Sequence, residues 1–227
     1  MSTILVEACV ETVESAVLAA TSGADRLELC AALEVGGVTP GSGLLRAVRT
    51  RVDIPLQVLI RPRTGDFQYD AGTLEAMRFD IAEARRAGAD GVVLGALNPD
   101  GNVDREALAT LLEAARPLSV TFHRAIDRTP DLGAGVATLV ELGVDRVLTA
   151  GGAETAASGL AGLAGLVRRF SPTIGIVAGG GVRADNVCRI VRESGVREVH
   201  LGPRLPGNGE LDVVELAATI GNLSRES

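Results

Sequence analysis

The feature that most constrains the fold is a unit repeated along the whole chain, a short apolar run followed by a longer amphipathic stretch. Eight such units are present, and each predicts one strand and one helix. The expected strands are Ile4–Cys9, Arg26–Cys30, Leu56–Arg61, Gly91–Gly95, Leu118–His123, Asp145–Thr149, Thr173–Gly179 and Arg197–Leu201. Helices are expected between them, for example over Thr12–Ser22, Gly43–Arg51, Gly72–Ala87, Asp104–Ala115 and Ala184–Ser194, and Leu211–Leu223 closes the eighth unit.

The junctions between units repeat one device: a helix end, a glycine, a small apolar residue and a polar residue that opens a strand. The four glycines are Gly23, Gly88, Gly143 and Gly195, and glycine is favoured where a helix stops in a left-handed conformation. Evenly spaced strand–helix units without linkers predict parallel strands in a single sheet. Eight strands can close that sheet, so we expect an α/β fold, a (βα)8 TIM-type barrel, with residues 1–227 as one domain. A doubly wound open sheet is the alternative, but it rarely needs eight evenly spaced units.

Composition excludes several classes of partner. The chain holds 22 basic and 29 acidic side chains, a net charge of −7, and only 2% aromatic residues. Such a chain is not expected to bind nucleic acid or an anionic membrane surface. No apolar run approaches the ~20 residues that span a bilayer, and the first residues lack the basic segment of an export signal. We therefore expect a cytoplasmic protein whose three cysteines are free thiols.

Strand alternation predicts which side chains enter the barrel. The side expected to face the helices is apolar, and the other side carries Glu7, Cys9, Glu28, Cys30, Gln57, Leu59, Arg61, Ser119, Thr121, His123, Glu198 and His200. Buried charges need partners, so Glu7, Glu28 and Glu198 should pair with Arg26, Arg61, Arg146 or histidine. A purely structural ion network is one interpretation. A functional site is favoured because Cys9, Cys30, Arg61 and His123 fall at the carboxyl ends of strands, where barrel enzymes keep their sites.

The two thiols Cys9 and Cys30 occupy matching positions on neighbouring predicted strands. Two converging thiolates suit a soft monovalent ion such as Cu(I). The alternative is that both are small buried apolar residues, which is how we interpret Cys188 on its predicted helix.

Polar residues cluster in the loops that follow the third, fifth and seventh predicted strands. Arg61 and Arg63 flank Pro62, and guanidinium groups there suit a carboxylate or phosphate; the alternative is a pair that balances the inner glutamates. Their loop runs to Tyr69 and is a candidate lid. His123, followed by Arg124 and Asp127, could act as acid, base or metal ligand, or be a satisfied core histidine. The run Gly179, Gly180 and Gly181 could form an anion-binding nest or only a tight turn.

Several phrases in combination resemble one family. They are Glu7–Val10, Ser15–Ala16, Gly23–Cys30, Gly36–Pro40, Ile60–Arg63, Thr121–Ala125 and Gly179–Arg183. With these phrases, nearly the whole chain resembles the CutC family, named for copper homeostasis. The resemblance implies a cytoplasmic, oligomeric (βα)8-like barrel with a part in copper handling.

Site residues follow from the resemblance as well. It implies Cys9 and Cys30 as Cu(I) ligands, and it implies a polar cluster at the barrel mouth made of Glu7, Glu28, Arg61, Arg63, His123, Arg124 and Asp127. The chain departs from the family pattern after His200, where Leu201–Arg204 replaces small polar residues. This departure puts the eighth loop, and any phosphate contact of Gly202, in doubt.

Three functions are compatible with these residues. The first is a homo-oligomeric Cu(I)-binding protein of copper homeostasis. The second is an isomerase or lyase acting on a small anionic or phosphorylated metabolite. In that case Glu7 or Glu28 is the base and His123 the acid, and the substrate-binding set is Arg61, Arg63, Arg124, Asp127, Gly179, Gly180, Gly181 and His200. The third is a barrel without catalytic activity that acts as an interaction partner.

Overall fold

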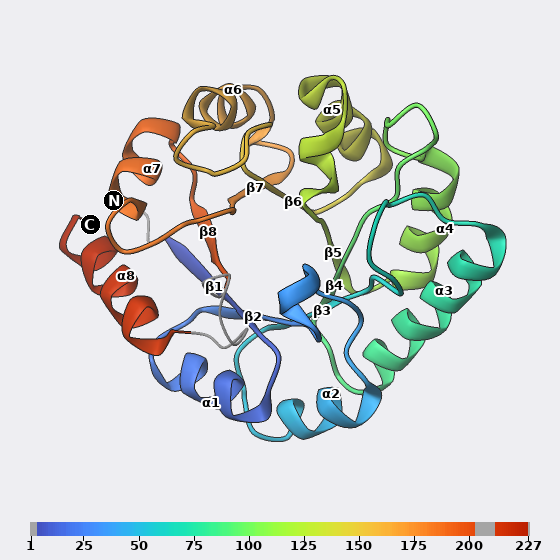
Figure 1. The fold of residues 1–227 in the computed structure, drawn as a ribbon, viewed down its shortest axis with the longest axis horizontal. Coiled ribbons are helices and arrows are strands. Elements are labelled where there is room, and N and C mark those ends of the chain that lie inside the picture. Colours follow the sequence, from blue (N-terminus) through green and yellow to red (C-terminus); the bar gives the residue numbers. More distant parts are fainter. Residues whose placement is uncertain (1–3, 203–211, 227) are drawn as a thin grey trace.

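A computed structural model describes residues 4–202 and 212–226. Its eight strands are parallel and close into a barrel in the order in which they occur along the chain (Figure 1). They are β1 Leu5–Val10, β2 Arg26–Leu29, β3 Leu56–Leu59, β4 Gly91–Leu94, β5 Ser119–Phe122, β6 Arg146–Thr149, β7 Gly175–Ala178 and β8 Glu198–Leu201. The first strand pairs with the last, with Leu5 opposite Glu198. The predicted (βα)8 barrel is confirmed, and the open sheet is excluded.

Several strands are shorter than predicted, and the third shows the cause most clearly. It ends at Leu59, two residues before the predicted end at Arg61. Ile60 still donates its backbone N–H to Val93 of β4, but Arg61 donates to the Thr39 hydroxyl instead. The backbone therefore leaves the sheet just before Pro62, which has no N–H to continue the ladder.

The helices surround the barrel (Figure 1). They are α1 Val13–Thr21, α2 Ser42–Arg49, α3 Ala71–Arg86, α4 Arg105–Ala115, α5 Leu132–Leu142, α6 Leu160–Phe170, α7 Val187–Ser194 and α8 Val213–Glu226, with short 3-10 turns η1 Leu33–Val35 and η2 Arg124–Arg128. None of the helices within residues 4–202 and 212–226 has both the length and the apolarity to cross a membrane.

Local chemistry fixes the helix ends. Asp104 caps α4 by accepting from the Ala107 N–H, and the four junction glycines have φ angles of +96°, +84°, +76° and +76°. Among the predicted helix starts, α7 departs most, because it begins at Val187 rather than Ala184. Residues 184–186 form a turn in which the Val187 N–H donates to the Arg183 carbonyl, and the Ala184 N–H donates to the Glu215 carboxylate of α8. The predicted start of the last helix, Leu211, lies outside the described residues.

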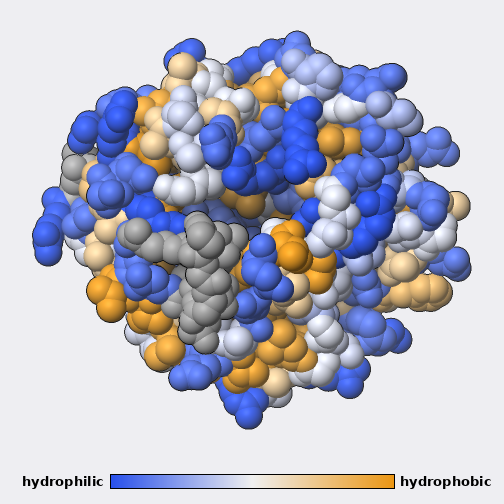
Figure 2. All heavy atoms as spheres, viewed as in Figure 1, coloured by the Kyte–Doolittle hydropathy of each residue, from blue (hydrophilic) through white to orange (hydrophobic). Residues whose placement is uncertain are grey.

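The apolar core lies between the barrel and its helices, whereas the barrel interior is largely polar. Outward-facing residues such as Val6, Leu27 and Val58 belong to the main apolar cluster. Inside the barrel there is one small apolar cluster, made of Cys9, Cys30, Leu33, Leu59 and Val93. In Figure 2, hydrophilic side chains border much of the hollow at the centre of the face, with apolar ones beside them. The alternation along the strands therefore gave the correct facing for the inner side chains.

Candidate functional site

A cavity of 660 Å³ opens at the carboxyl ends of the strands. Its lining includes Cys9, Glu28, Cys30 and His200, contributed by β1, β2 and β8. Arg61, His123, Arg124, Gly180 and Gly181 line it from the loops after β3, β5 and β7. Nine of the residues predicted from the sequence as site residues thus border one space.

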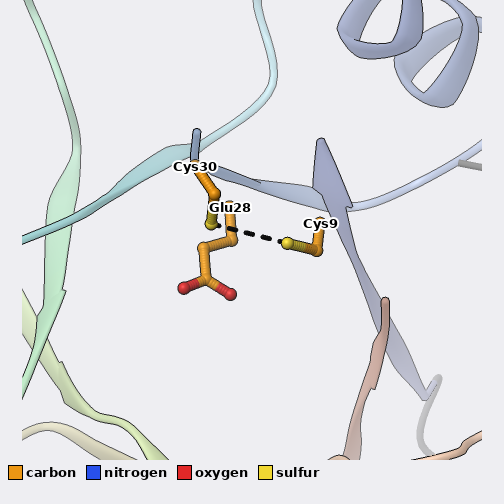
Figure 3. Close-up of side chains that lie close together, drawn as sticks. All are labelled: Cys9, Glu28 and Cys30. Carbon is orange, nitrogen blue, oxygen red and sulfur yellow. Dashed lines mark hydrogen bonds between the residues drawn. The ribbon is translucent and has the colours of Figure 1, made fainter. Parts of the chain in front are cut away.

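The two thiols form the most compact feature of this cavity. Cys9 lies on β1 and Cys30 directly follows β2, where its N–H bonds to the Val10 carbonyl. The two Sγ atoms are 3.5 Å apart. Figure 3 shows the side chains pointing toward each other, with Glu28 extending into the same space. One ligand atom from each of these three residues lies within 4.8 Å of the others. The predicted convergence of the two thiols is confirmed.

Hydrogen bonding makes the two thiols chemically unequal. The bond from Cys30, helped by the nearby His200, lowers the pKa of Cys9 to about 6. The same contact, together with burial, raises the pKa of Cys30 well above its usual 9.0. Cys9 is therefore the more acidic thiol of the pair, and Cys30 is the one that keeps its proton.

A network of ions beneath the thiols joins β1, β2 and β8. The Arg26 guanidinium pairs with Glu7 and, at 2.8 Å, with Glu198. His200 Nδ1 lies 2.7 Å from a Glu7 oxygen and 3.5 Å from a Glu28 oxygen. The predicted pairing of all three inner glutamates with arginine or histidine is thus present. Glu7 itself does not line the cavity.

The two glutamates in this network differ in their ionisation. Burial alone would raise the pKa of Glu7, but hydrogen bonding to His200 and the charge of Arg26 outweigh it and lower that pKa to about 2. Burial dominates at Glu28 and, with the nearby Cys9 thiolate, raises its pKa to about 8. Burial alone would lower the pKa of His200, but hydrogen bonds to Cys9 and Glu7 raise it well above 6.5. At pH 7, Glu7 is charged, Glu28 is a neutral acid and His200 is an imidazolium.

The two arginines flanking Pro62 do not act together. Arg61 is buried, and its Nη1 donates to the carbonyls of Gly36 and Gly37 at 3.0 and 2.9 Å. It therefore does not balance the inner glutamates, and that alternative was wrong. Arg63 lies outside the cavity wall, half-exposed and 2.8 Å from Asp66. Of the two arginines predicted to hold an anion, Arg61 lines the cavity and Arg63 does not.

His123 is the most unusual side chain of the wall. Its Nδ1 accepts the Ala125 N–H at 3.2 Å, so the ring proton sits on Nε2. That Nε2 is buried and has no hydrogen-bond partner. Burial and the charge of Arg61 lower the pKa of His123 to about 3. At neutral pH His123 is therefore a neutral N–H donor and not an imidazolium. Any role as an acid is limited to the proton that the neutral ring carries on Nε2.

Asp127 does not line this cavity but positions residues that do. Its carboxylate accepts the backbone N–H groups of Ala150 and Gly152 at 2.9 and 3.0 Å, which holds the loop after β6. It also pairs with Arg124 Nε at 3.0 Å. These contacts give Asp127 a role in positioning Arg124 and the loop after β6.

Only part of the predicted glycine nest faces the cavity. Gly180 and Gly181 line it, with φ angles of +96° and +70°. Gly179 lies behind them, where a Cβ would stand 2.5 Å from a Leu148 methyl group. The sequence analysis did not single out Glu154, Thr155 or Leu33 as lining residues. The glycines Gly151 and Gly152 just before Glu154 were the only local signal for that loop.

Comparison with known proteins places these residues in a wider group. The model of the CutC family matches residues 4–204. The family protein CutC of Xanthomonas campestris pv. campestris (strain 8004) is 48% identical over 200 residues, which cover 88% of this chain and 83% of that protein. The copper homeostasis protein cutC homolog of Homo sapiens is 46% identical, covering 88% and 73%. The solved structure of CutC from Streptococcus agalactiae has a TM-score of 0.83 and 35% identity, covering 87% of this chain and 98% of that one.

Proposed function

The chain belongs to the CutC family, and we propose that it is a copper homeostasis protein that holds one Cu(I) ion between Cys9 and Cys30. The observation that carries the proposal is the approach of the two Sγ atoms to 3.5 Å inside a cavity that opens to solvent. No strand has to separate for an ion to reach them, because both thiols border the cavity.

The donor set fits a soft ion. Thiolates bind soft ions such as Cu(I) and also bind Zn²⁺, but Zn²⁺ takes four ligands in structural sites. Mg²⁺ and Ca²⁺ require several oxygen ligands. Within residues 4–202 and 212–226, the carboxyl group that lies with the two thiols is that of Glu28, and burial raises its pKa to about 8. A hard cation would therefore find few charged oxygen ligands beside the sulfur pair. Binding of Cu(I) would displace the proton that Cys30 retains, so metal uptake releases acid.

The proposal is tested by an anaerobic Cu(I) titration in competition with a chromophoric chelator. Wild type should withdraw one Cu(I) per chain, and Cys9→Ser and Cys30→Ser should each lose at least about a hundredfold in affinity, since one thiolate ligand is removed. Cys188→Ser is the matched control, because Cys188 lies on α7 packed against the apolar core. Equal competition by wild type and both inner variants would overturn the proposal.

The setting of this function is also part of the proposal. A dithiol that binds Cu(I) must stay reduced, and the cytoplasm maintains that state. We place the protein there, as a homo-oligomer. Light scattering coupled to size-exclusion chromatography tests the oligomer, and a mass equal to one chain would refute it.

A further inference from the structure

We propose that the cavity above the thiols also binds a small organic phosphate. Its phosphate would lie against Gly180, Gly181 and Arg124, and an oxygen of its organic part would accept the hydrogen bond of His123 Nε2. This site goes beyond the proposed copper function and rests on different side chains.

The first argument is size. A metal ion between Cys9 and Cys30 would occupy only one edge of a cavity of 660 Å³. Cavities that hold small organic molecules have volumes of about 300–1,000 Å³, with apolar walls and a few directed polar groups. This cavity fits that description, because Leu33, Leu59 and Phe67 line it beside the arginines and His123.

The second argument is an unused donor. Only 7% of the His123 surface is exposed, and its Nε2 hydrogen has no partner. Native proteins rarely leave buried donors unpaired, because the group loses its water without gaining a replacement. His123 borders the cavity, and its Nε2 hydrogen requires an acceptor such as a carbonyl, hydroxyl or phosphate oxygen.

The third argument places the phosphate. Two consecutive glycines in the left-handed region expose their N–H groups, and neither N–H donates to any residue in the ranges 4–202 and 212–226. The Arg124 guanidinium lies directly over Gly180, where a Cβ would stand 2.8 Å from Nη1. Asp127 and the carbonyls of Ala153 and Glu154 hold that guanidinium in place through Nε and Nη2. Backbone amides beside a fixed guanidinium match the oxygens of a phosphate.

Charge supports the same assignment. The chain as a whole carries −7, yet the cavity wall is rich in arginine: Arg61, Arg124 and Arg183 line it, against the carboxyl groups of Glu28 and Glu154. A cationic recess in an acidic protein focuses anions there. The loop after the seventh strand is also where barrels of this architecture bind phosphate groups.

The test is calorimetric titration of copper-free protein with three probes: ribose 5-phosphate, ribose and inorganic phosphate. Ribose 5-phosphate should bind, inorganic phosphate should bind more weakly at the same place, and ribose should not bind. His123→Asn should weaken ribose 5-phosphate binding at least about tenfold while leaving inorganic phosphate unchanged. The asparagine oxygen can still accept the Ala125 N–H, so the turn after β5 keeps its cap.

A second pair of variants distinguishes the loss of a binding contact from misfolding. Arg124→Met should weaken both phosphates at least about tenfold, whereas Arg63→Met, which alters an arginine outside the cavity wall, should change neither. Cys9→Ser should bind both phosphates as wild type does, so this site and the copper site can fail separately. The proposal is overturned if neither phosphate binds, or if the His123, Arg124 and Arg63 variants all behave as wild type.

Discussion

Burial of a neutral His123 makes the stability of this protein depend on pH, and replacement by asparagine should remove that dependence. The pKa of His123 is about 3 in the folded chain, against a usual 6.5. The unfolded chain therefore takes up a proton as the pH falls below 6.5, and the folded chain does not until about pH 3. Protonation favours the unfolded state throughout that window, so stability is lost as the solution becomes more acidic.

The size of the effect follows from the gap between the two pKa values. A difference of one unit between the folded and unfolded pKa corresponds to about 1.4 kcal/mol in the free energy of unfolding. At pH 5 the solution lies about 1.5 units below the unfolded pKa and still well above the folded one, so His123 should cost the wild type about 2 kcal/mol. At pH 8 both states are neutral at this position and the cost vanishes. Asparagine does not titrate, so the variant lacks this contribution at either pH.

The measurement is urea denaturation of wild type and His123→Asn at both pH values. Between pH 8 and pH 5 the wild type should lose about 2 kcal/mol more than the variant, which is a midpoint lower by about 0.7 M for an m-value of about 3 kcal/mol/M. Other titrating groups, Glu7 and Glu28 among them, are present in both proteins and cancel in the comparison. An identical pH dependence for the two proteins would show that His123 can take up a proton in the folded state.

Two further predictions concern the framework. Arg26→Met should lower the free energy of unfolding by about 3–5 kcal/mol, because it leaves the buried Glu7 carboxylate without its guanidinium. Arg105→Met removes an exposed ion pair and should change the free energy of unfolding by less than about 0.5 kcal/mol. Equal losses for the two variants in urea denaturation would contradict this. Gly159→Ala should cost about 3 kcal/mol, because its methyl group would stand 1.8 Å from a backbone carbonyl oxygen. Gly165→Ala, inside α6, should raise the free energy of unfolding by about 0.5–1 kcal/mol, because its Cβ would meet only Arg168 Nη2 at an ordinary 3.9 Å. Thermal denaturation compares the two variants, and a tolerated Gly159→Ala would refute the contact.

The fold was predictable because its signals are local and repeated. Each strand–helix unit carries its own apolar pattern and its own terminal glycine, so an error at one boundary does not propagate to the next unit. Alternation within β1 and β2 then placed Glu7, Cys9, Glu28 and Cys30 inside the barrel, since the side-chain period of a strand is fixed by its pleat. The convergence of the two thiols follows from that facing together with the pairing of neighbouring strands.

The remainder of the site depends on contacts that no local pattern encodes. The ring of His200 meets Glu7 across 193 positions of the chain, a contact that exists only because the barrel closes. Arg61 and Arg63 lie two residues apart, and their separation into a buried and an exposed side chain is decided by the loop, where strand alternation has ended. The positioning role of Asp127 depends on the loop after β6, which carries the amides that its carboxylate accepts.

The two proposed ligands draw on different residues of one cavity. Thiols, which suit a soft metal ion, come from β1 and the end of β2, whereas the arginines, glycines and neutral histidine, which suit a phosphate, come from the loops after β3, β5 and β7. Barrel closure brings the two sets together without any residue having to serve both. A substitution at Cys9 therefore alters the proposed copper site and leaves the Arg124–Gly180 contact intact, and a substitution at Arg124 does the reverse. Because each set has its own variants and its own probe, binding of copper and binding of an organic phosphate are separable properties of the same chain.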